Sequence, residues 1–450
     1  MNDTIFEIFK AYDIRGKVGT ELNTDLAFRI GAALAEWLPT KGIVAVGRDM
    51  RPDSKELAEA FIRGLTAQGR EVWNIGEVTS DMIYFAVGNY SLAGGAVITA
   101  SHNPGAYNGI KIYRDKVTPV GLDTGLAEIR DMVLSDAVFP NRTEGIVTQK
   151  DITAAWVSHA LSMVSPGGWP EYRIAIDAGN GMAGAILPHV LPHLPIDAEE
   201  MYFTPDGTFP NHEANPQDEK NLSDLIDAVI KNSYDFGIAF DGDGDRAAFV
   251  DGKGRPILGT DIISIVAKYI LAMHPGSEIV HDVRTSLATR ELIREWGGTP
   301  VRTKAGRVYI GALLRERGAQ FGGETTGHLF FADNYDADSG LIAALMVIQA
   351  LTESGRKLSD LVDEYRRYEM PREKNLEVAD KQAVFARLKE VFKNDEQDEL
   401  DGLTVTTADG WFNLRASNTE PVMRLTIEGK TEAAVQSLLE EVLSATEPNA

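Results

Sequence analysis

Three aspartates at alternating positions are the sharpest chemical signal in this sequence. They lie in Asp241-Gly242-Asp243-Gly244-Asp245-Arg246, directly after the apolar run Phe236 to Phe240, so we expect them at the carboxyl end of a buried strand. Adjacent carboxylates repel one another unless a cation lies among them, and magnesium or calcium prefers such hard oxygen ligands. An EF-hand loop would need glycine sixth and glutamate twelfth, where this chain has Arg246 and Gly252. We interpret the run as a metal site of another kind, with a solvated acidic turn as the alternative.

A serine follows a second apolar run. Thr99-Ala100-Ser101-His102-Asn103-Pro104 comes after an expected strand at 95–99, and Tyr107-Asn108-Gly109-Ile110-Lys111 follows soon after. A hydroxyl exposed at a strand end can act as a nucleophile or carry a phosphate. The Gly-x-Ser-x-Gly elbow of acyl hydrolases is not present at this serine. Taken alone, the run also fits an ordinary polar turn.

Two further loops carry polar side chains. Gly322-Gly323-Glu324-Thr325-Thr326-Gly327-His328 combines a carboxylate, hydroxyls and an imidazole, which suits sugar hydroxyls and proton transfer. Arg415-Ala416-Ser417-Asn418-Thr419-Glu420-Pro421 places a guanidinium beside hydroxyl and amide groups, a set that can clamp a phosphate. In isolation, each loop could be a capped turn.

A glycine-rich run at 179–184 matches the dinucleotide fingerprint G-x-G-x-x-G. The stretch after it contains Pro188, Pro192 and Pro195, so the helix that should receive a pyrophosphate is expected to be short or broken. We therefore interpret this run as a structural turn. Nearby histidines at 189, 193 and 212 have no metal-ligand spacing to the aspartates and are expected to face solvent.

The elements that must position these loops alternate between strands and helices. A helix begins at Asp53-Ser54 and carries Leu57, Phe61 and Leu65 on one stripe. This rhythm implies right-handed crossovers and largely parallel sheets. The expected strands before the C-terminal region are 43–47, 71–75, 95–99, 173–177 and 278–283. After residue 400 the pattern changes to strands at 403–407, 410–416 and 422–428 and a helix from Lys430, which favours a small α+β domain.

Composition narrows the class of protein further. The chain has 450 residues, no cysteine and a net charge of −23, which excludes disulfides and thiolate sites. The negative electrostatic field of such a protein repels nucleic acid and anionic membranes, so an anionic ligand needs a local basic pocket. The N-terminal residues lack the pattern of a signal peptide, and the apolar run at 341–351 is too short to span a membrane. We expect a cytoplasmic multidomain protein.

Together, the four loops resemble, in their order and sequence, those of the α-D-phosphohexomutase superfamily, in particular its bacterial phosphomannomutase/phosphoglucomutase branch. The resemblance extends from Ala11-Tyr12-Asp13-Ile14-Arg15-Gly16 to the loop at Arg415. It implies an α/β protein with three related α/β domains, whose sheets are mixed and largely parallel, and a smaller C-terminal α+β domain, around a central active-site cleft. The four domains are expected at residues 1–150, 151–252, 253–368 and 369–450.

The same resemblance implies that hexose 1-phosphates and 6-phosphates, of mannose and also glucose, are interconverted. Ser101 would be phosphorylated, and a hexose 1,6-bisphosphate would serve as activator and intermediate. Mg²⁺ would bind Asp241, Asp243, Asp245 and the phosphate of Ser101. The expected partner is a small-molecule sugar phosphate, with no nucleic acid and no membrane. Further catalytic residues would be His102, Lys111, Arg15, Arg246 and His328. Substrate contacts would come from Arg284, Arg307, Glu324, Thr326, His328, Arg415, Ser417, Asn418 and Thr419.

Three positions differ from the pattern of this branch. Arg284 stands where lysine is often found, Arg307 where histidine is common, and Thr326 replaces a common serine but keeps the hydroxyl. Arginine is larger and always charged, so the exchange from histidine can change sugar preference. The alternatives are a phosphoglucosamine mutase, a magnesium-dependent sugar phosphatase using the same serine, and a sugar-phosphate binder without activity. An intact serine, three aspartates and Arg246 argue against a mere binder. Mannose and glucose differ at one carbon, so the sequence does not rank them.

Overall fold

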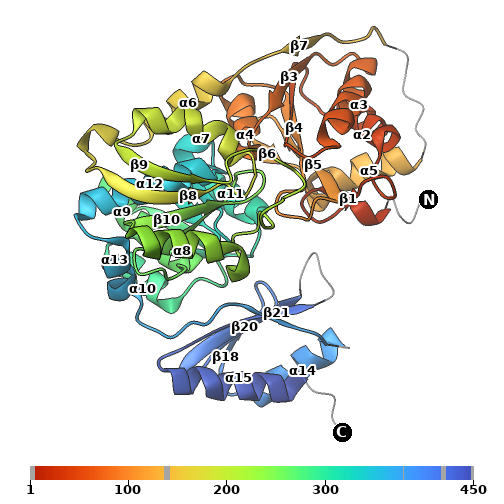
Figure 1. The fold of residues 1–450 in the computed structure, drawn as a ribbon. Helices are drawn as coiled ribbons and strands as arrows, with labels where there is room; N and C mark the ends of the chain where they lie inside the picture. Colours follow the sequence, from red (N-terminus) through yellow and green to blue (C-terminus); the bar gives the residue numbers. More distant parts are fainter. Residues whose placement is uncertain (1–5, 136–141, 379, 417–421, 447–450) are drawn as a thin grey trace. The chain divides into compact units, whose positions relative to one another are not determined.

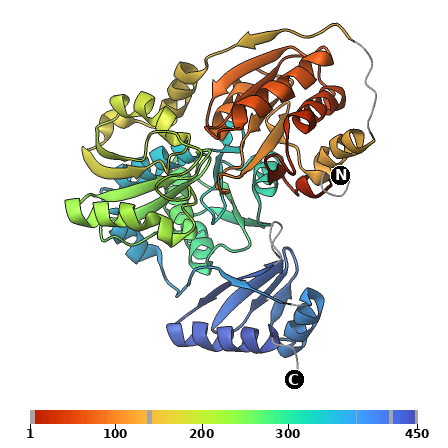
Figure 2. The same ribbon diagram turned by 45° about the vertical axis from the view of Figure 1, so that its right-hand side comes forward.

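The computed structural model describes residues 6–135, 142–378, 380–416 and 422–446. The chain divides into two compact units (Figures 1 and 2). The first comprises Met1–Ile257 and Thr326–Ser359, and the second comprises Leu258–Thr325 and Asp360–Ala450. In the part of the chain described, no helix has the length and apolar character needed to cross a bilayer.

The first unit begins with a seven-stranded mixed sheet. β2, β3, β4 and β7 run parallel, whereas β1, β5 and β6 pair antiparallel. The strand order is β1 (Ile14–Lys17), β5 (Tyr107–Arg114), β4 (Gly94–Ile98), β2 (Val44–Arg48), β3 (Val72–Glu77) and β7 (Val147–Gln149), with β6 (Thr118–Pro119) beside β5. The helices are α2 (Thr24–Trp37), α3 (Ser54–Ala67), α4 (Ser80–Asn89) and α5 (Leu126–Leu134).

Helix α3 forms because its apolar stripe packs into the core of this layer. Leu57, Phe61 and Leu65 are at most 2% exposed, as their spacing predicted. The expected cap differs in detail: Asp53 occupies the N-cap position, but its side chain makes no capping hydrogen bond. Ser54 instead donates its hydroxyl proton to Asp49.

A four-stranded sheet follows in the same unit. Its order is β11 (Ala247–Asp251), β10 (Phe236–Phe240), β8 (Tyr172–Asp177) and β9 (Ile196–Met201), and β11 is its antiparallel strand. The helices of this region are α6 (Thr153–Ser162), α7 (Ala183–Val190) and α8 (Ser223–Asn232). Because Phe240 pairs with Ala247, residues 241–246 form the hairpin loop between β10 and β11. The unit also contains the antiparallel pair β15 (Leu329–Phe331) and β16 (Ala337–Asp338), and helix α12 (Gly340–Ser354).

The second unit contains parallel strands from the third α/β segment. β12 (Glu278–Asp282) lies between β13 (Thr299–Thr303) and β14 (Phe321–Gly323). The accompanying helices are α9 (Gly259–Met273), α10 (Leu287–Glu295) and α11 (Arg307–Arg317). The loops that follow the three strands therefore leave from one edge of the sheet, which is where parallel sheets hold ligands.

The C-terminal part of the second unit is an antiparallel sheet with two helices on one face (Figure 1). Its order is β17 (Lys374–Leu376), β21 (Met423–Gly429), β20 (Gly410–Ala416), β19 (Leu403–Thr406) and β18 (Glu396–Asp398). The helices are α14 (Lys381–Val391) and α15 (Glu432–Thr446), and α13 (Leu358–Tyr365) precedes this region in the chain. The core joins Phe412 and Leu425 of the sheet to Leu388 and Val442 of the helices. This is the α+β domain that the sequence predicted.

Candidate active site

Ser101 lies in the loop after β4 and has an unusual backbone conformation. Its φ is +51°, in the left-handed region that few non-glycine residues adopt. Its backbone N–H donates to Thr99 Oγ1 at 2.9 Å, and the residue is 4% exposed. Strain of this kind persists where the surroundings hold the residue firmly, and it is concentrated at functional sites.

Arg51, which the sequence did not single out, holds this loop in place. Its guanidinium is fully buried and pairs with Asp49 at 3.1 Å. It donates to four carbonyl oxygens of the serine loop at 2.5–2.9 Å, those of Ser101, Asn103, Pro104 and Tyr107. These contacts fix the backbone around the serine.

The three aspartates lie directly against this serine. Ser101 Oγ donates to Asp241 Oδ2 at 2.8 Å, and one carboxylate oxygen of each aspartate lies within 4.8 Å of the others. Each intervening glycine is required for its own reason. A Cβ at Gly242 would lie 2.5 Å from the carbonyl oxygen of Ser101, and Gly244 has a φ of +75°, a conformation that favours glycine. The predicted nucleophile and the predicted metal loop therefore form one site.

Two buried cations offset most of this negative charge. Lys111 Nζ lies 2.5 Å from Asp243 Oδ2 and 2.5 Å from Asp245 Oδ2. Arg246 contacts Asp241 Oδ2 at 2.7 Å and donates to Ser101 Oγ at 3.0 Å. Burial alone would raise the pKa of Asp243, but Lys111 holds it well below its ordinary value. For Asp241, burial outweighs the attraction of Arg246 and raises the pKa to about 6.

The chemistry of the carboxylates fits a divalent metal ion. Asp243 Oδ1 and Asp245 Oδ1 are buried and accept no hydrogen bond. A buried anionic oxygen that accepts no hydrogen bond is costly, and a hard cation would satisfy both oxygens. Asp241, Asp243 and Asp245 can thus hold a metal.

His102 and Arg15 lie beside the serine loop. Arg246 Nη2 donates to His102 Nδ1, while burial and the positive charge of Arg246 lower the pKa of this histidine well below its usual value. His102 is therefore neutral and acts as an acceptor. Arg15 donates to the side chain of Asn103 and pairs with Asp13 at 2.6 Å.

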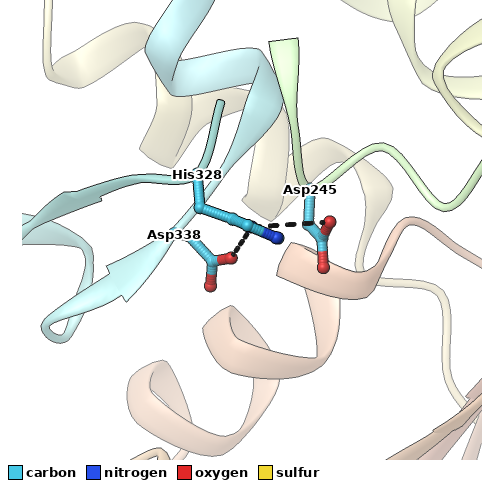
Figure 3. A group of neighbouring side chains, drawn as sticks. All are labelled: Asp245, His328 and Asp338. Carbon is cyan, nitrogen blue, oxygen red and sulfur yellow. Dashed lines mark ion pairs between the residues drawn. The ribbon is translucent and has the colours of Figure 1, made fainter. Parts of the chain in front are cut away.

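His328 approaches the same carboxylates from the segment before β15 (Figure 3). Its Nδ1 lies 2.5 Å from Asp338 Oδ2 and 3.8 Å from Asp245 Oδ1. Burial would lower the pKa of this histidine, but the charges of Asp245 and Asp338 outweigh burial and raise it. Thr326, two residues earlier, accepts at its carbonyl oxygen a hydrogen bond of 2.9 Å from Gln217.

The second unit brings another group of predicted residues together. Arg284 follows β12 and Glu324 follows β14, and the guanidinium contacts Glu324 Oε1 at 2.8 Å. The same group forms a fork with Asp282, at 3.1 Å to Oδ1 and 2.9 Å to Oδ2. Burial alone would lower the pKa of Arg284, but the neighbouring carboxylates outweigh burial and raise it. Arg307, the first residue of α11, follows β13 at the same edge of the sheet.

Glu373 links this group to Arg415 of β20. Its carboxylate lies 3.7 Å from Arg284 and 3.3 Å from Arg415 Nη2. Burial and the nearby charge of Arg284 lower the pKa of Arg415, so this guanidinium lies in a setting that favours an added anion. Ser417, Asn418 and Thr419, the other predicted phosphate contacts, lie outside the described residues.

The sequence reasoning missed several residues that hold these groups. They are Asp49, Arg51, Ser80, Asp282, Asp338 and Glu373. Asp282 lies two residues before a predicted site residue, which was an available signal. Ser80 donates to Asp243 across a sequence separation of 163 residues, and no local pattern indicates such a contact.

Comparison with known proteins agrees with this geometry. Four domain descriptions match in order: phosphoglucomutase/phosphomannomutase alpha/beta/alpha domain I at residues 7–137, domain II at 156–254, domain III at 259–368 and the C-terminal domain at 373–445. A protein of Xanthomonas campestris pv. campestris named phosphohexose mutases is 40% identical over 95% of this chain and 96% of its own length. A phosphomannomutase of Salmonella montevideo is 38% identical over 94% of each chain.

Solved structures show the same relationship. The crystal structure of a phosphoglucomutase/phosphomannomutase family protein from Burkholderia thailandensis superposes with a TM-score of 0.90, at 31% identity and 98% coverage of each chain. The fold and the site define a phosphotransferase of the isomerase class. The chain belongs to the phosphoglucomutase/phosphomannomutase family.

Proposed function

We propose that this protein interconverts hexose 1-phosphates and hexose 6-phosphates, with mannose phosphates and also glucose phosphates as substrates. The observation that carries the proposal is the contact between the Ser101 hydroxyl and the buried three-aspartate loop. A binding protein would not need a strained, hydrogen-bonded hydroxyl at this position. A phosphotransferase needs a group that can carry the phosphate between two positions of one sugar.

Ser101 would carry a phosphate in the resting enzyme, and a hexose 1,6-bisphosphate would be the intermediate that turns around before it returns a phosphate. Asp241, Asp243 and Asp245 would hold Mg²⁺ together with the serine phosphate. A bound Mg²⁺ supplies charge neutralisation at the phosphoryl oxygens. Arg246, which donates to Ser101 Oγ, and Lys111 and Arg15 would balance charge that develops during transfer.

The remaining residues would recognise the sugar phosphate and move protons. His102 is held as a neutral acceptor by Arg246, and His328 would exchange a proton with a sugar hydroxyl. Glu324 and Thr326 would bind sugar hydroxyls. Arg284 and Arg307 would face the sugar, and Arg415 would hold the phosphate that is not being transferred, together with Ser417, Asn418 and Thr419. The protein would act in the cytoplasm on these small molecules.

Phosphorus NMR tests this proposal. Purified protein is incubated with Mg²⁺ and a trace of glucose 1,6-bisphosphate, with mannose 1-phosphate or glucose 1-phosphate in parallel tubes. We expect conversion to the 6-phosphates, loss of conversion in Ser101→Ala, and unchanged conversion in Ser162→Ala, whose hydroxyl is on the exposed face of α6. Release of inorganic phosphate would instead identify a phosphatase. Conversion of glucosamine phosphate alone would identify a phosphoglucosamine mutase.

A further inference from the structure

His212 is paired with a buried carboxylate for which the proposed function gives no role. The spacing of this histidine from the aspartates of the metal loop (residues 241–246) predicted a solvent-facing side chain. The structure instead places it, partly buried, against Asp177 at the end of β8, with Nε2 and Oδ2 3.0 Å apart. Asp177 is 1% exposed, and its other carboxylate oxygen accepts from the backbone N–H of Gly179 at 2.7 Å. The pair thus connects His212 to the start of the glycine-rich run at 179–184.

Both ring nitrogens of His212 face groups that accept hydrogen bonds. Nδ1 lies 3.0 Å from the carbonyl oxygen of Glu213, which can only accept. Nε2 faces the carboxylate of Asp177, which also accepts when it is ionised. An imidazole that donates from both nitrogens is the protonated, cationic form. The geometry therefore favours an imidazolium at this position.

The charged and titratable groups around His212 agree with this protonation state. Burial alone would lower the pKa of His212, but the hydrogen bond and the charge of Asp177 outweigh burial and raise it. The ring of Tyr202 packs edge-on against the imidazole at 5.3 Å, and its hydroxyl donates to Asp224 of α8 at 2.6 Å. The charge of Asp224 also favours the cation.

His212 belongs to a strap, residues 202–214, that is bonded to the glycine turn, residues 179–182. Asn180, inside this turn, has a φ of +55°. Its backbone N–H, its carbonyl oxygen and both polar atoms of its side chain bond to the strap at 2.8–2.9 Å. The strap and the turn are therefore joined at several points besides His212. The partners of Asn180 are the backbone of Tyr202, Thr204 and Asp206 and the side chain of Asn211.

The glycine turn also contacts the metal loop. The backbone N–H of Met182 donates to the carbonyl oxygen of Gly242 at 2.9 Å. A Cβ at Gly181 would lie 2.8 Å from that same oxygen, so the two backbones approach at a distance that only glycine allows. A Cβ at Gly179 would lie 3.1 Å from Cβ of Ala214 in the strap. The turn therefore links the strap to the metal loop.

The same strap contacts the arginine that fixes the serine loop. The ring of Phe209 lies 5.1 Å from the guanidinium carbon of Arg51, and a Cβ at Gly207 would lie 2.4 Å from Cα of Arg51. Tyr202 and Phe209 have positive φ values of +55° and +51°, a strain that persists where the surroundings impose the conformation. One segment thus connects the support of the nucleophile with the support of the metal loop.

We propose that His212, as an imidazolium, is a positioning residue of the metal loop, an inference that rests on the proposed function. Its two hydrogen bonds lock the strap onto the glycine turn, and the turn sets the position of Gly242 between the first two aspartates. Loss of one proton leaves Nε2 with no hydrogen to donate to Asp177, so the lock weakens. The carboxylates of the metal loop then lose part of the fixed arrangement that a metal ion needs.

Histidine-selective ¹⁵N NMR tests the protonation state without turnover. His212→Gln identifies the signal among the eight histidines. We expect both nitrogens of His212 to carry protons at pH 6 and its titration midpoint to lie above about 6.5, the ordinary value for histidine. Asp177→Asn, whose amide oxygen can still accept from Gly179 while its nitrogen donates to Nε2, should lower that midpoint. A wild-type midpoint below the ordinary value would overturn the proposal.

Titration calorimetry with Mg²⁺ measures the effect on the metal loop. At pH 6.5, His212→Gln should bind Mg²⁺ about tenfold more weakly, the lower end of the loss expected when a group that supports metal ligands is removed. His193→Gln, at an exposed position, is the matched control and should bind as wild type does. Urea unfolding of each variant shows whether the protein is folded during the titration.

The pH profile of Mg²⁺ binding separates positioning from general support of the fold. The lock is complete below about pH 6.5 and is lost as the pH rises through the raised pKa of His212. Wild-type affinity should therefore fall over the pH range in which NMR shows His212 to titrate, whereas carboxylate ligands alone do not bind a metal more weakly at higher pH. His212→Gln should lack this fall.

Unchanged affinity in a folded His212→Gln protein, or a wild-type affinity that does not follow the titration of His212, would overturn the role of this histidine alone. A wild-type protein that binds no Mg²⁺ and converts no hexose phosphate would overturn the proposed function and, with it, this role.

Discussion

Replacing Lys111 with methionine should destabilise the protein strongly, because two buried carboxylates share this ammonium group. Nζ lies 2.5 Å from an oxygen of Asp243 and 2.5 Å from one of Asp245, and the lysine side chain is 4% exposed. Without it, the negative charge of the three buried carboxylates is offset by Arg246, 2.7 Å from Asp241 Oδ2, and by His328, 3.8 Å from Asp245 Oδ1. Removing one partner of a buried ion pair costs about 3–5 kcal/mol. We expect a loss of that size at pH 7.5 in EDTA.

The pH dependence of this loss separates charge from shape. In wild type, Lys111 holds the pKa of Asp243 well below its ordinary value, so this carboxylate stays ionised and stabilising from pH 7.5 to pH 5. In the variant, burial without the ammonium raises the pKa of the carboxyls. The folded variant then binds protons more tightly than its unfolded chain, so it gains stability as the pH falls. The difference from wild type should therefore be smaller at pH 5 than at pH 7.5.

Urea unfolding followed by tryptophan fluorescence measures this difference at both pH values. Lys55→Met is the matched control, since Lys55 is exposed on α3, and its effect should stay within about 0.5 kcal/mol. A Lys111→Met protein as stable as the control, or one with the same loss at both pH values, would refute the charge pairing.

Three further predictions concern other groups. Burial lowers the pKa of His281 to about 4, so the folded protein binds this proton less readily than the unfolded chain does. The free energy of unfolding should therefore keep its full value above about pH 6.5 and fall by about 3 kcal/mol towards pH 4. In His281→Gln, the urea midpoint should change less with pH over this range. Arg284→Met leaves Asp282 and Glu324 without their shared cation and should raise the KM for the sugar phosphate in saturation kinetics. An unchanged KM would show that Arg284 does not take part in substrate binding. Asp243→Asn removes one hard ligand, and Mg²⁺ titration calorimetry should show at least about tenfold weaker binding; unchanged affinity would place the metal elsewhere.

Much of the fold was predictable because its signals are local. The run from Phe236 to Phe240 is β10, and the aspartates follow it as the spacing indicated. The expected strand at 43–47 is Val44–Arg48, a shift of one residue that is usual at element ends. The proposed domain bounds at residues 150, 252 and 368 stay a prediction.

The support of the site was not predictable in the same way. Arg51 lies in a turn-like run with no motif, yet its guanidinium holds the serine loop about fifty residues away in sequence. Asp338 meets His328 through the register of β15 and β16, and the sequence gives no register for two strands of three and two residues. Long-range pairs of this kind depend on tertiary packing, which local patterns do not contain.

Transfer of a labelled phosphate tests most directly the claim that Ser101 carries the phosphoryl group. The dephosphorylated protein is mixed with ³²P-labelled glucose 1,6-bisphosphate and Mg²⁺, quenched and digested, and the labelled peptide is sequenced. We expect the label on Ser101, and its loss when unlabelled glucose 6-phosphate or mannose 6-phosphate is added before quenching. Label on another residue, or label that sugar phosphates do not remove, would contradict the account.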